Sequence, residues 1–488
     1  MIWKRIALLL LISIGAVMVH GYHPAAEDGE IYLPGVKKDL NPALYPANDR
    51  FFMSHARMTL FDETIAASVR TSYLPFDHAV FLWHFACIFA LLLGCWRIAR
   101  ACFASELAAW GGVALVAALL TIPVAGTALY IMDQYLTPRD LSTAGIALVL
   151  ADALEHKFWR AGICILLIAA IHPLMAVFGI GMLFLLYLEE RRSASAPSLR
   201  TAASSALPIF PVLPWPAPIS GIYRQVLDRH SYFVVVRWEW YEWVGIFAPL
   251  AILYGFGRYG RAKGLPKLEA LTRALIVFGL TFFAAGLVVS IPRLASLALL
   301  QPMRNLHLIF IMMFVLAGGL LARSVLKAHL WRWALLLTPV CLGMFLVQRQ
   351  LFPATEHLEL PGRSPANSWV QAFVWVRDHT PREAMFALDP GYMELPGEDQ
   401  HGFRAVAERS ALADALKDGG AVSMFPAMAP VWYEQVQAQR GWKSFQRADF
   451  QRLRRDYGVT WVVLQGAGGV PGLSCPYRNP AVAVCLTE

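Results

Sequence analysis

The chain has 488 residues, of which 57% are hydrophobic and only 16% are charged. Soluble globular proteins carry about 25% charged residues, so this composition excludes an ordinary soluble enzyme. The high apolar content also excludes a disordered chain. Apolar residues come in runs of about 15–25 that are separated by short charged stretches, which is typical of a chain that crosses a membrane many times.

The net charge of +8 is distributed unevenly. Residues 351–488 carry 13 Lys and Arg against 15 Asp and Glu, so the positive excess belongs to residues 1–350. There it lies in the short loops between apolar runs, where Lys and Arg set the orientation of a membrane protein. We therefore expect no nucleic-acid partner.

Apolar runs predict about 11 membrane spans. They cover residues 6–19, 79–96, 109–130, 142–156, 161–171, 174–188, 202–213, 243–257, 268–290, 305–322 and 331–349. With the N-terminus in the cytoplasm, the cytoplasmic loops are 97–100, 157–160, 189–200, 258–267 and 323–332. Each contains at least two Lys or Arg, in agreement with the positive-inside rule. The first run is also short enough for a cleaved signal peptide, and either interpretation makes residues 21–77 an outer loop.

Residues 350–488 predict a small α/β domain that follows the transmembrane module of residues 1–349. Apolar spacing indicates a helix at Ser368–His379, and a second helix at Asp449–Tyr457 would end at Gly458. Short β-prone runs predict strands at 384–388, 460–464 and 481–485. The count of spans places this domain on the periplasmic side of the inner membrane.

Two further features of this domain involve single side chains. Cys475 and Cys485 both lie in it, and an oxidising compartment would allow a disulfide between them. Arg404 and Arg409 face no obvious partner, and we expect a structural role for them. The seven cysteines include no CxxC pair, so the cysteine pattern does not indicate a zinc site.

The outer loop begins with titratable residues close to the first span. His23, Glu27, Asp28 and Glu30 lie within eight residues of one another. Charged groups near lipid are costly, so this cluster indicates a polar site. A carboxylate there could act as a general base toward a hydroxyl or hold a metal ion. The alternative is a solvated loop with its ordinary share of charge.

Three outer arginines are candidates for binding a phosphate. Pro138 is expected at a helix start, which places Arg139 beside a helix N-terminus, where anions are favoured. Arg293 and Arg304 lie in an outer loop against the positive-inside trend, so orientation does not explain them. The alternatives are an interfacial role for Arg139 and pairing of the other two with head groups or local carboxylates.

The runs 161–171 and 174–188 are too short to cross a membrane comfortably, and His172 and Pro173 join them. Because proline interrupts a helix, two short helices that meet at a polar break often line a cavity. A simple hairpin with a tight outer turn is the alternative.

Together, these features resemble the GT-C superfamily of integral membrane glycosyltransferases, in its bacterial branch. The resemblance rests on a first span, adjacent acids in a long outer loop, an outer C-terminal domain and short motifs. The motifs are Glu27-Asp28, Tyr135 to Arg139, His172-Pro173 and Gln301 to Arg304. Members take a sugar from a polyprenyl-phosphate carrier and pass it to an acceptor outside the cytoplasm.

The resemblance implies a role for individual residues. Asp28 matches the catalytic carboxylate, with Glu27 next to it, and would deprotonate an acceptor hydroxyl that attacks the anomeric carbon with inversion. Asp28 would also be the ligand of a divalent ion, Mg²⁺ or Mn²⁺, if one is used. The departing lipid phosphate would be bound by Arg139, Arg293 and Arg304. The weaker candidates are His55 and His172 for phosphate or sugar contacts, and Asp133 and Asp140 for a second acid in the second outer loop.

The implied partners are a polyprenyl-phosphate-linked sugar, membrane lipids, and a glycan, lipid or protein acceptor. Two other classes of function compete with this interpretation. A transporter or flippase for a lipid-linked glycan would usually show broken helices in both halves, and the sequence indicates one broken pair. A non-catalytic assembly protein would not require Asp28.

Overall fold

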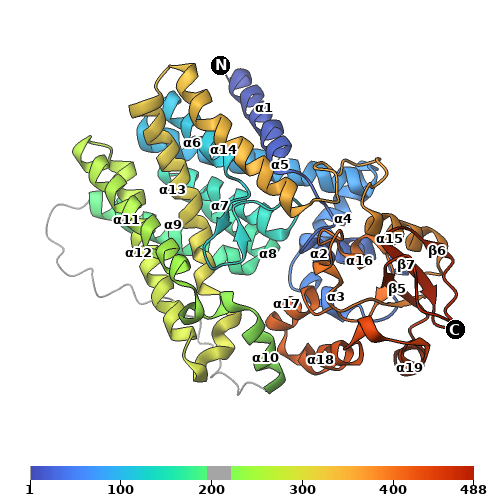
Figure 1. Cartoon of the computed structure of the whole chain (residues 1–488). Coiled ribbons are helices and arrows are strands. Elements are labelled where there is room, and N and C mark those ends of the chain that lie inside the picture. The colour runs from blue at the N-terminus through green and yellow to red at the C-terminus, as the bar shows by residue number, and fades with distance from the viewer. Residues whose placement is uncertain (1, 195–220) are drawn as a thin grey trace.

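The structure is a computed structural model that describes residues 2–194 and 221–488. Apolar helices form one end of the molecule, and the C-terminal domain lies at the other end (Figure 1). The outer loop lies at the same end as the C-terminal domain and contains the helices α2 (Gly29–Leu40), α3 (Arg50–Ala56) and α4 (Phe61–Ser72).

Apolar helices build the membrane module, and most of them follow the predicted runs. They are α1 (Ile2–His20), α5 (Phe76–Phe103), α6 (Glu106–Ala118), α7 (Pro138–Leu154), α8 (Phe158–Ile171), α9 (Pro173–Ala194), α11 (Trp240–Ala262), α12 (Pro266–Val289), α13 (Leu306–Leu321) and α14 (Leu330–Leu351). The run 174–188 was predicted to be too short for a comfortable crossing, but it belongs to a helix of 22 residues, α9, that is long enough to cross a membrane. Within the described ranges, 6 helical stretches are long and apolar enough to cross a membrane. The run 202–213 lies outside the described residues, so the total of 11 spans stays a prediction.

The predicted span at 109–130 is wrong in its second half. α6 ends at Ala118, and the chain then forms an antiparallel hairpin of β1 (Pro123–Val124) and β2 (Leu129–Tyr130). Gly126 has a positive φ of 64°, and a Cβ there would clash with the Trp238 ring. Only glycine fits this close turn, whereas hydropathy alone does not separate a buried apolar hairpin from a helix.

The C-terminal domain contains a mixed five-stranded sheet with the order β4-β3-β5-β7-β6. β3 pairs in parallel with β4 and β5, while β7 runs antiparallel to β5 and β6. The strands are β3 (Met385–Ala387), β4 (Ser410–Ala411), β5 (Trp461–Gln465), β6 (Tyr477–Arg478) and β7 (Val482–Leu486). The helices are α15 (Ser368–His379), α16 (Phe403–Ala407), α17 (Lys417–Met424), α18 (Ala429–Ala438) and α19 (Arg447–Tyr457).

Several predictions for this domain are confirmed. α15 has the predicted bounds, and α19 ends before Gly458, which takes a positive φ of 70°. β7 alternates between two cores, because Val484 packs with α15 on one face of the sheet and Cys485 packs with α19 on the other. Cys475 and Cys485 form a disulfide.

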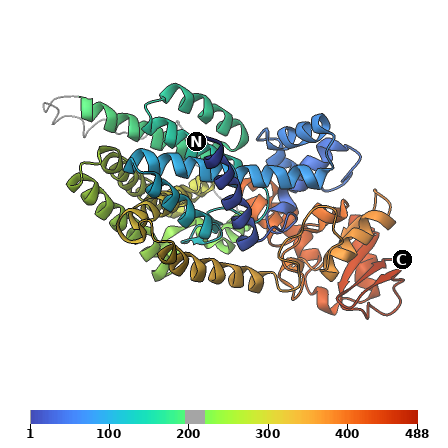
Figure 2. The ribbon, with the colours of Figure 1, turned by 90° about the horizontal axis from the view of Figure 1, so that it is seen from above.

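The C-terminal domain docks on the first residues of the outer loop, beside the end of the helical module (Figure 2). Tyr22 pairs with Leu358 and Ala26 pairs with His401 in isolated β-bridges. The Glu27 N–H donates to the Gln400 carbonyl at 2.8 Å, so this domain fixes the backbone of the predicted acidic site.

Two histidines join this docking surface to one carboxylate. Glu359 accepts hydrogen bonds from His23 Nδ1 at 3.2 Å and from His401 Nε2 at 2.7 Å. The other ring nitrogen of His401 lies 3.0 Å from the Glu398 carbonyl. Since both nitrogens of His401 face acceptors, the ring is protonated. Burial lowers the pKa of His401, but Glu359 outweighs it and raises that pKa to about 9.

This arrangement predicts a pH-dependent contribution to stability. Folding raises the pKa of His401 from 6.5 to about 9, so the charged ring favours the folded state. This stabilisation is fully present below pH 6.5 and is lost as the pH rises through about 9. We expect His401→Gln to lower the thermal unfolding midpoint most below neutral pH, with the difference from wild type shrinking well above pH 9. Scanning fluorimetry in detergent would measure this, with His379→Gln on the exposed end of α15 as control. A difference that does not change with pH would refute the charged pair.

Candidate active site

A cavity of about 1060 Å³ lies where the outer loop, the membrane helices and the C-terminal domain meet. Its polar side collects residues from segments far apart in the sequence. These residues are Glu27, Asp28, Tyr32, His55, Asp133, Arg139, His172, Tyr232, Gln301, Arg304 and Lys417. The cavity therefore brings together seven of the nine residues that the sequence nominated for catalysis or for donor contacts.

Glu27 and Asp28 form an acidic pair at the start of α2. Lys417 Nζ contacts the Glu27 carboxylate and lies 3.1 Å from Asp28 Oδ1. The other carboxylate oxygen of Asp28 lies 3.8 Å from Arg139 Nη2. The Asp28 side chain keeps 34% of its surface exposed toward the cavity, so a ligand can reach it.

The two cations control the protonation of Asp28. Burial alone would raise its pKa, but Lys417 and Arg139 outweigh burial and hold the pKa of Asp28 well below its usual range. Asp28 is thus a carboxylate at any physiological pH. It can accept a hydrogen bond, whereas its low basicity makes it a weak base before a reaction begins.

Arg139 is positioned by the start of α7, as predicted. Thr137 and Asp140 form a capping box around Pro138, the first residue of the helix. Arg139 forms a buried ion pair with Asp133, so its charge is shared between Asp133 and Asp28. The Asp140 carboxylate accepts a hydrogen bond from the Thr137 N–H within this cap, and Asp140 does not line the cavity.

Arg304 is more available than Arg139 to bind an anion in the cavity. It lies 5.4 Å from the Tyr232 ring centroid, and no carboxylate pairs with it in the described part of the chain. Its Nε and the Oε1 of Gln301 are buried without a hydrogen-bond partner among the described residues. Gln301 also has a positive φ of 45°. Unsatisfied buried polar atoms that line a cavity are what a bound polar group would satisfy.

The two nominated histidines also line the cavity. His172 caps α8 and separates it from α9, so the predicted break between the two helices is confirmed. His172 lines the cavity at this break. His55 on α3 lies edge-on to Phe425 at 4.9 Å, and burial lowers the pKa of His55 to about 4. A neutral His55 can donate or accept one hydrogen bond but does not bind an anion by charge.

Arg293 is exposed and lies outside the cavity lining. The initial cluster is also divided by the structure, because His23 binds Glu359, and Glu30 is buried against Arg404. Only Glu27 and Asp28 of that cluster face the cavity.

Lys417, Tyr32, Tyr232 and Gln301 were not nominated for catalysis or donor contacts. Lys417 lies 389 positions after Asp28 and belongs to no motif, so nothing in a single sequence relates the two. The Gln-Pro-x-Arg motif in the sequence includes Gln301, but only its arginine was predicted to have a function.

The opposite side of the cavity is apolar. Leu174 of α9, residues of α11 and residues of α13 line it, namely Val244, Ala248, Ile252, Phe310 and Met313. Val244 and Ile252 are exposed on the surface of α11. This side therefore reaches the apolar surface of the membrane helices, and it suits a hydrocarbon chain.

A divalent ion does not fit the acidic pair as the side chains stand. Mg²⁺ and Mn²⁺ take about six ligands, largely oxygens. Within residues 2–194 and 221–488, no three His, Cys, Asp or Glu residues form a metal-holding group. Lys417 contacts both Glu27 and Asp28, and Arg139 occupies Asp133.

No family model matches the chain, and no curated protein matches it. Two similar solved structures are oligosaccharyltransferases from Archaeoglobus fulgidus. The first, AglB with an inhibitory peptide and a dolichol-phosphate, has 11% identity and a TM-score of 0.47, covering 95% of this chain and 69% of that chain. The second, tethered to an acceptor peptide by a disulfide, has 11% identity, the same coverage and a TM-score of 0.49. At these identities and TM-scores the two structures say nothing about the chemistry of the site, which must come from its own residues.

Proposed function

We propose that this protein is a membrane glycosyltransferase of the GT-C type. It transfers a sugar from a polyprenyl-phosphate-linked donor to an acceptor on the outer side of the inner membrane. The observation that carries the proposal is one cavity with an acidic pair, an apolar side and an arginine, Arg304, that has no carboxylate partner among the described residues. These are the three features that a carboxylate-assisted displacement of a lipid phosphate requires.

The donor is proposed to bind across both sides of the cavity. The polyprenyl chain lies along α9, α11 and α13, and its phosphate faces Arg304. A guanidinium pairs with two phosphate oxygens at once, which fixes the donor as well as attracting it. Arg139 supports the phosphate less strongly, because Asp133 shares its charge. His172 can donate a further hydrogen bond to the phosphate or the sugar, and Gln301 Oε1 can accept one from a sugar hydroxyl.

The reaction is proposed to be a direct displacement with inversion. An acceptor hydroxyl oxygen attacks the anomeric carbon, the bond between that carbon and the lipid phosphate oxygen breaks, and the phosphate leaves with the electron pair. Arg304 stabilises the charge that develops on the phosphate. Asp28 accepts the hydroxyl proton, and its low pKa places this transfer late, after the new bond has largely formed.

The acceptor is a glycan, lipid or protein that reaches the cavity beside α17. The Glu27–Asp28 pair lies at the contact between the outer loop and the C-terminal domain, so an acceptor bound there meets both. This proposal places the C-terminal domain in the periplasm, where a disulfide between Cys475 and Cys485 is stable.

Removal of the Arg304 charge tests its role in stabilising the leaving phosphate. We expect Arg304→Gln to lower transfer by about 10²-fold or more, mainly through the rate constant of transfer, because its cation stabilises the leaving phosphate. Transfer of label from a lipid-linked sugar fraction to endogenous acceptors in isolated membranes would measure the effect. Arg293→Gln is the matched control, since Arg293 comes from the same outer loop but is exposed. Equal activity of the two variants would refute the role of Arg304.

The function itself is tested by the glycans of cells that lack this chain. A missing envelope glycan that returns with the wild-type chain, but not with an equally abundant Arg304→Gln chain, supports a transferase. An unchanged glycan profile would count against it.

A further inference from the structure

We propose that Lys417 is the resident cation of the Glu27–Asp28 pair, so that this pair works without a divalent ion. The ammonium group comes from the C-terminal domain and performs the charge-balancing and positioning task that a metal ion performs between other paired carboxylates. This inference rests on the proposed function, because it assigns the cation that the same site uses.

The contacts of Lys417 are those of a bound ion and not of a surface lysine. Its Nζ contacts the carboxylates of both Glu27 and Asp28, and only 13% of its side chain is exposed. Two adjacent carboxylates repel each other, and a cation between them offsets that repulsion. Lys417 supplies that cation and leaves the second oxygen of Asp28 directed toward Arg139.

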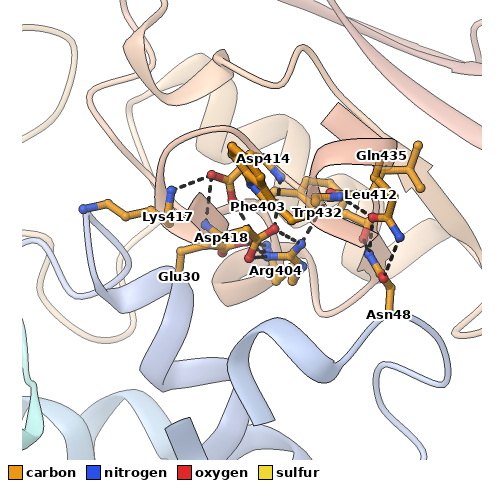
Figure 3. A network of polar contacts seen from close by, with 12 residues as sticks. Glu30, Asn48, Phe403, Arg404, Leu412, Asp414, Lys417, Asp418, Trp432 and Gln435 are labelled. Carbon is orange, nitrogen blue, oxygen red and sulfur yellow. Dashed lines mark hydrogen bonds and ion pairs between the residues drawn. The ribbon is translucent and has the colours of Figure 1, made fainter. Parts of the chain in front are cut away.

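A buried network holds Lys417 in place from the protein side (Figure 3). Asp414 Oδ1 accepts hydrogen bonds from the backbone N–H groups of Leu416 at 2.8 Å and Lys417 at 2.5 Å, at the start of α17. The Lys417 side chain extends away from this network and away from Arg404. The backbone of Lys417 is therefore fixed while its ammonium group reaches the cavity.

The same network fixes Asp28 relative to Lys417. Arg404 binds Asp418 through Nη1 at 3.0 Å and Nη2 at 2.7 Å, and it binds Glu30 through Nη1 at 3.2 Å. Glu30 also accepts the Ala405 N–H at 3.0 Å. Glu30 is two residues from Asp28, and Asp418 follows Lys417. Arg404 thus joins the two segments that carry the acid and its cation.

The charge of the site leaves little room for a divalent ion. Such an ion would lie next to the Lys417 ammonium, and like charges at this distance repel strongly in a partly buried site. To reach both carboxylates, the ion would have to displace Lys417. Docking of the C-terminal domain brings Lys417 to the acidic pair. This role explains why the site includes a residue from that domain.

The decisive readout is metal binding by the full-length protein, which does not depend on activity. Purified wild type and Asp28→Asn would be titrated with Mn²⁺ alone, and bound ions counted by electron paramagnetic resonance. We expect the two proteins to bind the same number of Mn²⁺ ions. A wild-type protein that binds one more ion than Asp28→Asn would overturn the proposal, because that ion would reside at the pair.

Activity provides the second readout. We expect wild type to keep its transfer rate within about twofold in excess chelator, and Lys417→Met to lose about 10²-fold or more. Lys417→Arg retains a cation and is expected to recover a measurable part of that loss. Lys443→Met, on an exposed lysine of the same domain, is the matched control. Loss of wild-type activity in chelator with recovery in Mn²⁺ would overturn the proposal, as would a Lys417→Met protein as active as wild type.

A replacement variant and the independent Mn²⁺ count cover failure of folding and failure of transfer. If Lys417→Met does not fold, Lys417→Gln replaces it, because its amide still donates to the carboxylates but carries no charge. If wild type transfers no sugar with or without divalent ions, the proposed function fails, while the Mn²⁺ count still decides whether Lys417 excludes a metal.

Discussion

Asp28→Asn is expected to lower the rate of sugar transfer by about 10³-fold. The amide has nearly the same shape as the carboxylate, but it does not take a proton from the acceptor hydroxyl. It also removes one of the two anions that bind Lys417. Transfer of labelled sugar from a lipid-linked donor, measured with equal amounts of each purified protein, would give the ratio of rates.

Asp39→Asn is the matched control, because Asp39 lies on the last turn of the same helix α2 and does not line the cavity. Its activity is expected to equal that of wild type. An Asp28→Asn protein that transfers sugar within about tenfold of wild type would show that Asp28 is not the proton acceptor.

The second large effect is expected on stability, from Arg404→Met. Arg404 is buried with 2% of its side chain exposed and pairs with Glu30 and Asp418. Removing one partner of a buried ion pair costs about 3–5 kcal/mol, because the remaining charges stay buried without compensation. We therefore expect a clear fall in the thermal unfolding midpoint. We also expect faster proteolysis of the segments of the outer loop and the C-terminal domain that contact each other.

Arg455→Met is the control for Arg404→Met, since Arg455 is exposed on α19 and its ion pair is with its neighbour Asp456. Exposed ion pairs contribute about 0–1 kcal/mol, so this variant should unfold like wild type. Equal unfolding midpoints for the two variants would contradict the view that the Arg404 network holds the domains together.

The sequence predicted those features whose signal is local. Apolar periodicity located α15, and glycine after Tyr457 marked the end of α19. The motif around Pro138 placed Arg139 at a helix start, because the capping box is contained within four residues. Hydropathy failed at 119–130, where a hairpin is as apolar as a helix.

The site was predicted only in part because its partners come from distant segments. The acidic pair was visible as adjacent residues, but its cation Lys417 lies 389 positions away from Asp28. Likewise, Arg404 had no visible partner in the sequence, and its partner Glu30 was grouped with the candidate catalytic acids although it is structural. Charge clusters in a sequence do not distinguish carboxylates that face a cavity from those that join two domains.

The measurement that tests the central claim most directly is sugar transfer by the purified full-length protein in proteoliposomes. The donor would be the lipid-linked sugar fraction from cells that lack the chain, and released polyprenyl phosphate would be measured by mass spectrometry. We predict that wild type releases polyprenyl phosphate together with a glycosylated acceptor, and that Asp28→Asn releases neither. Movement of intact donor across the bilayer without release, or equal release by both proteins, would contradict a transferase that depends on Asp28.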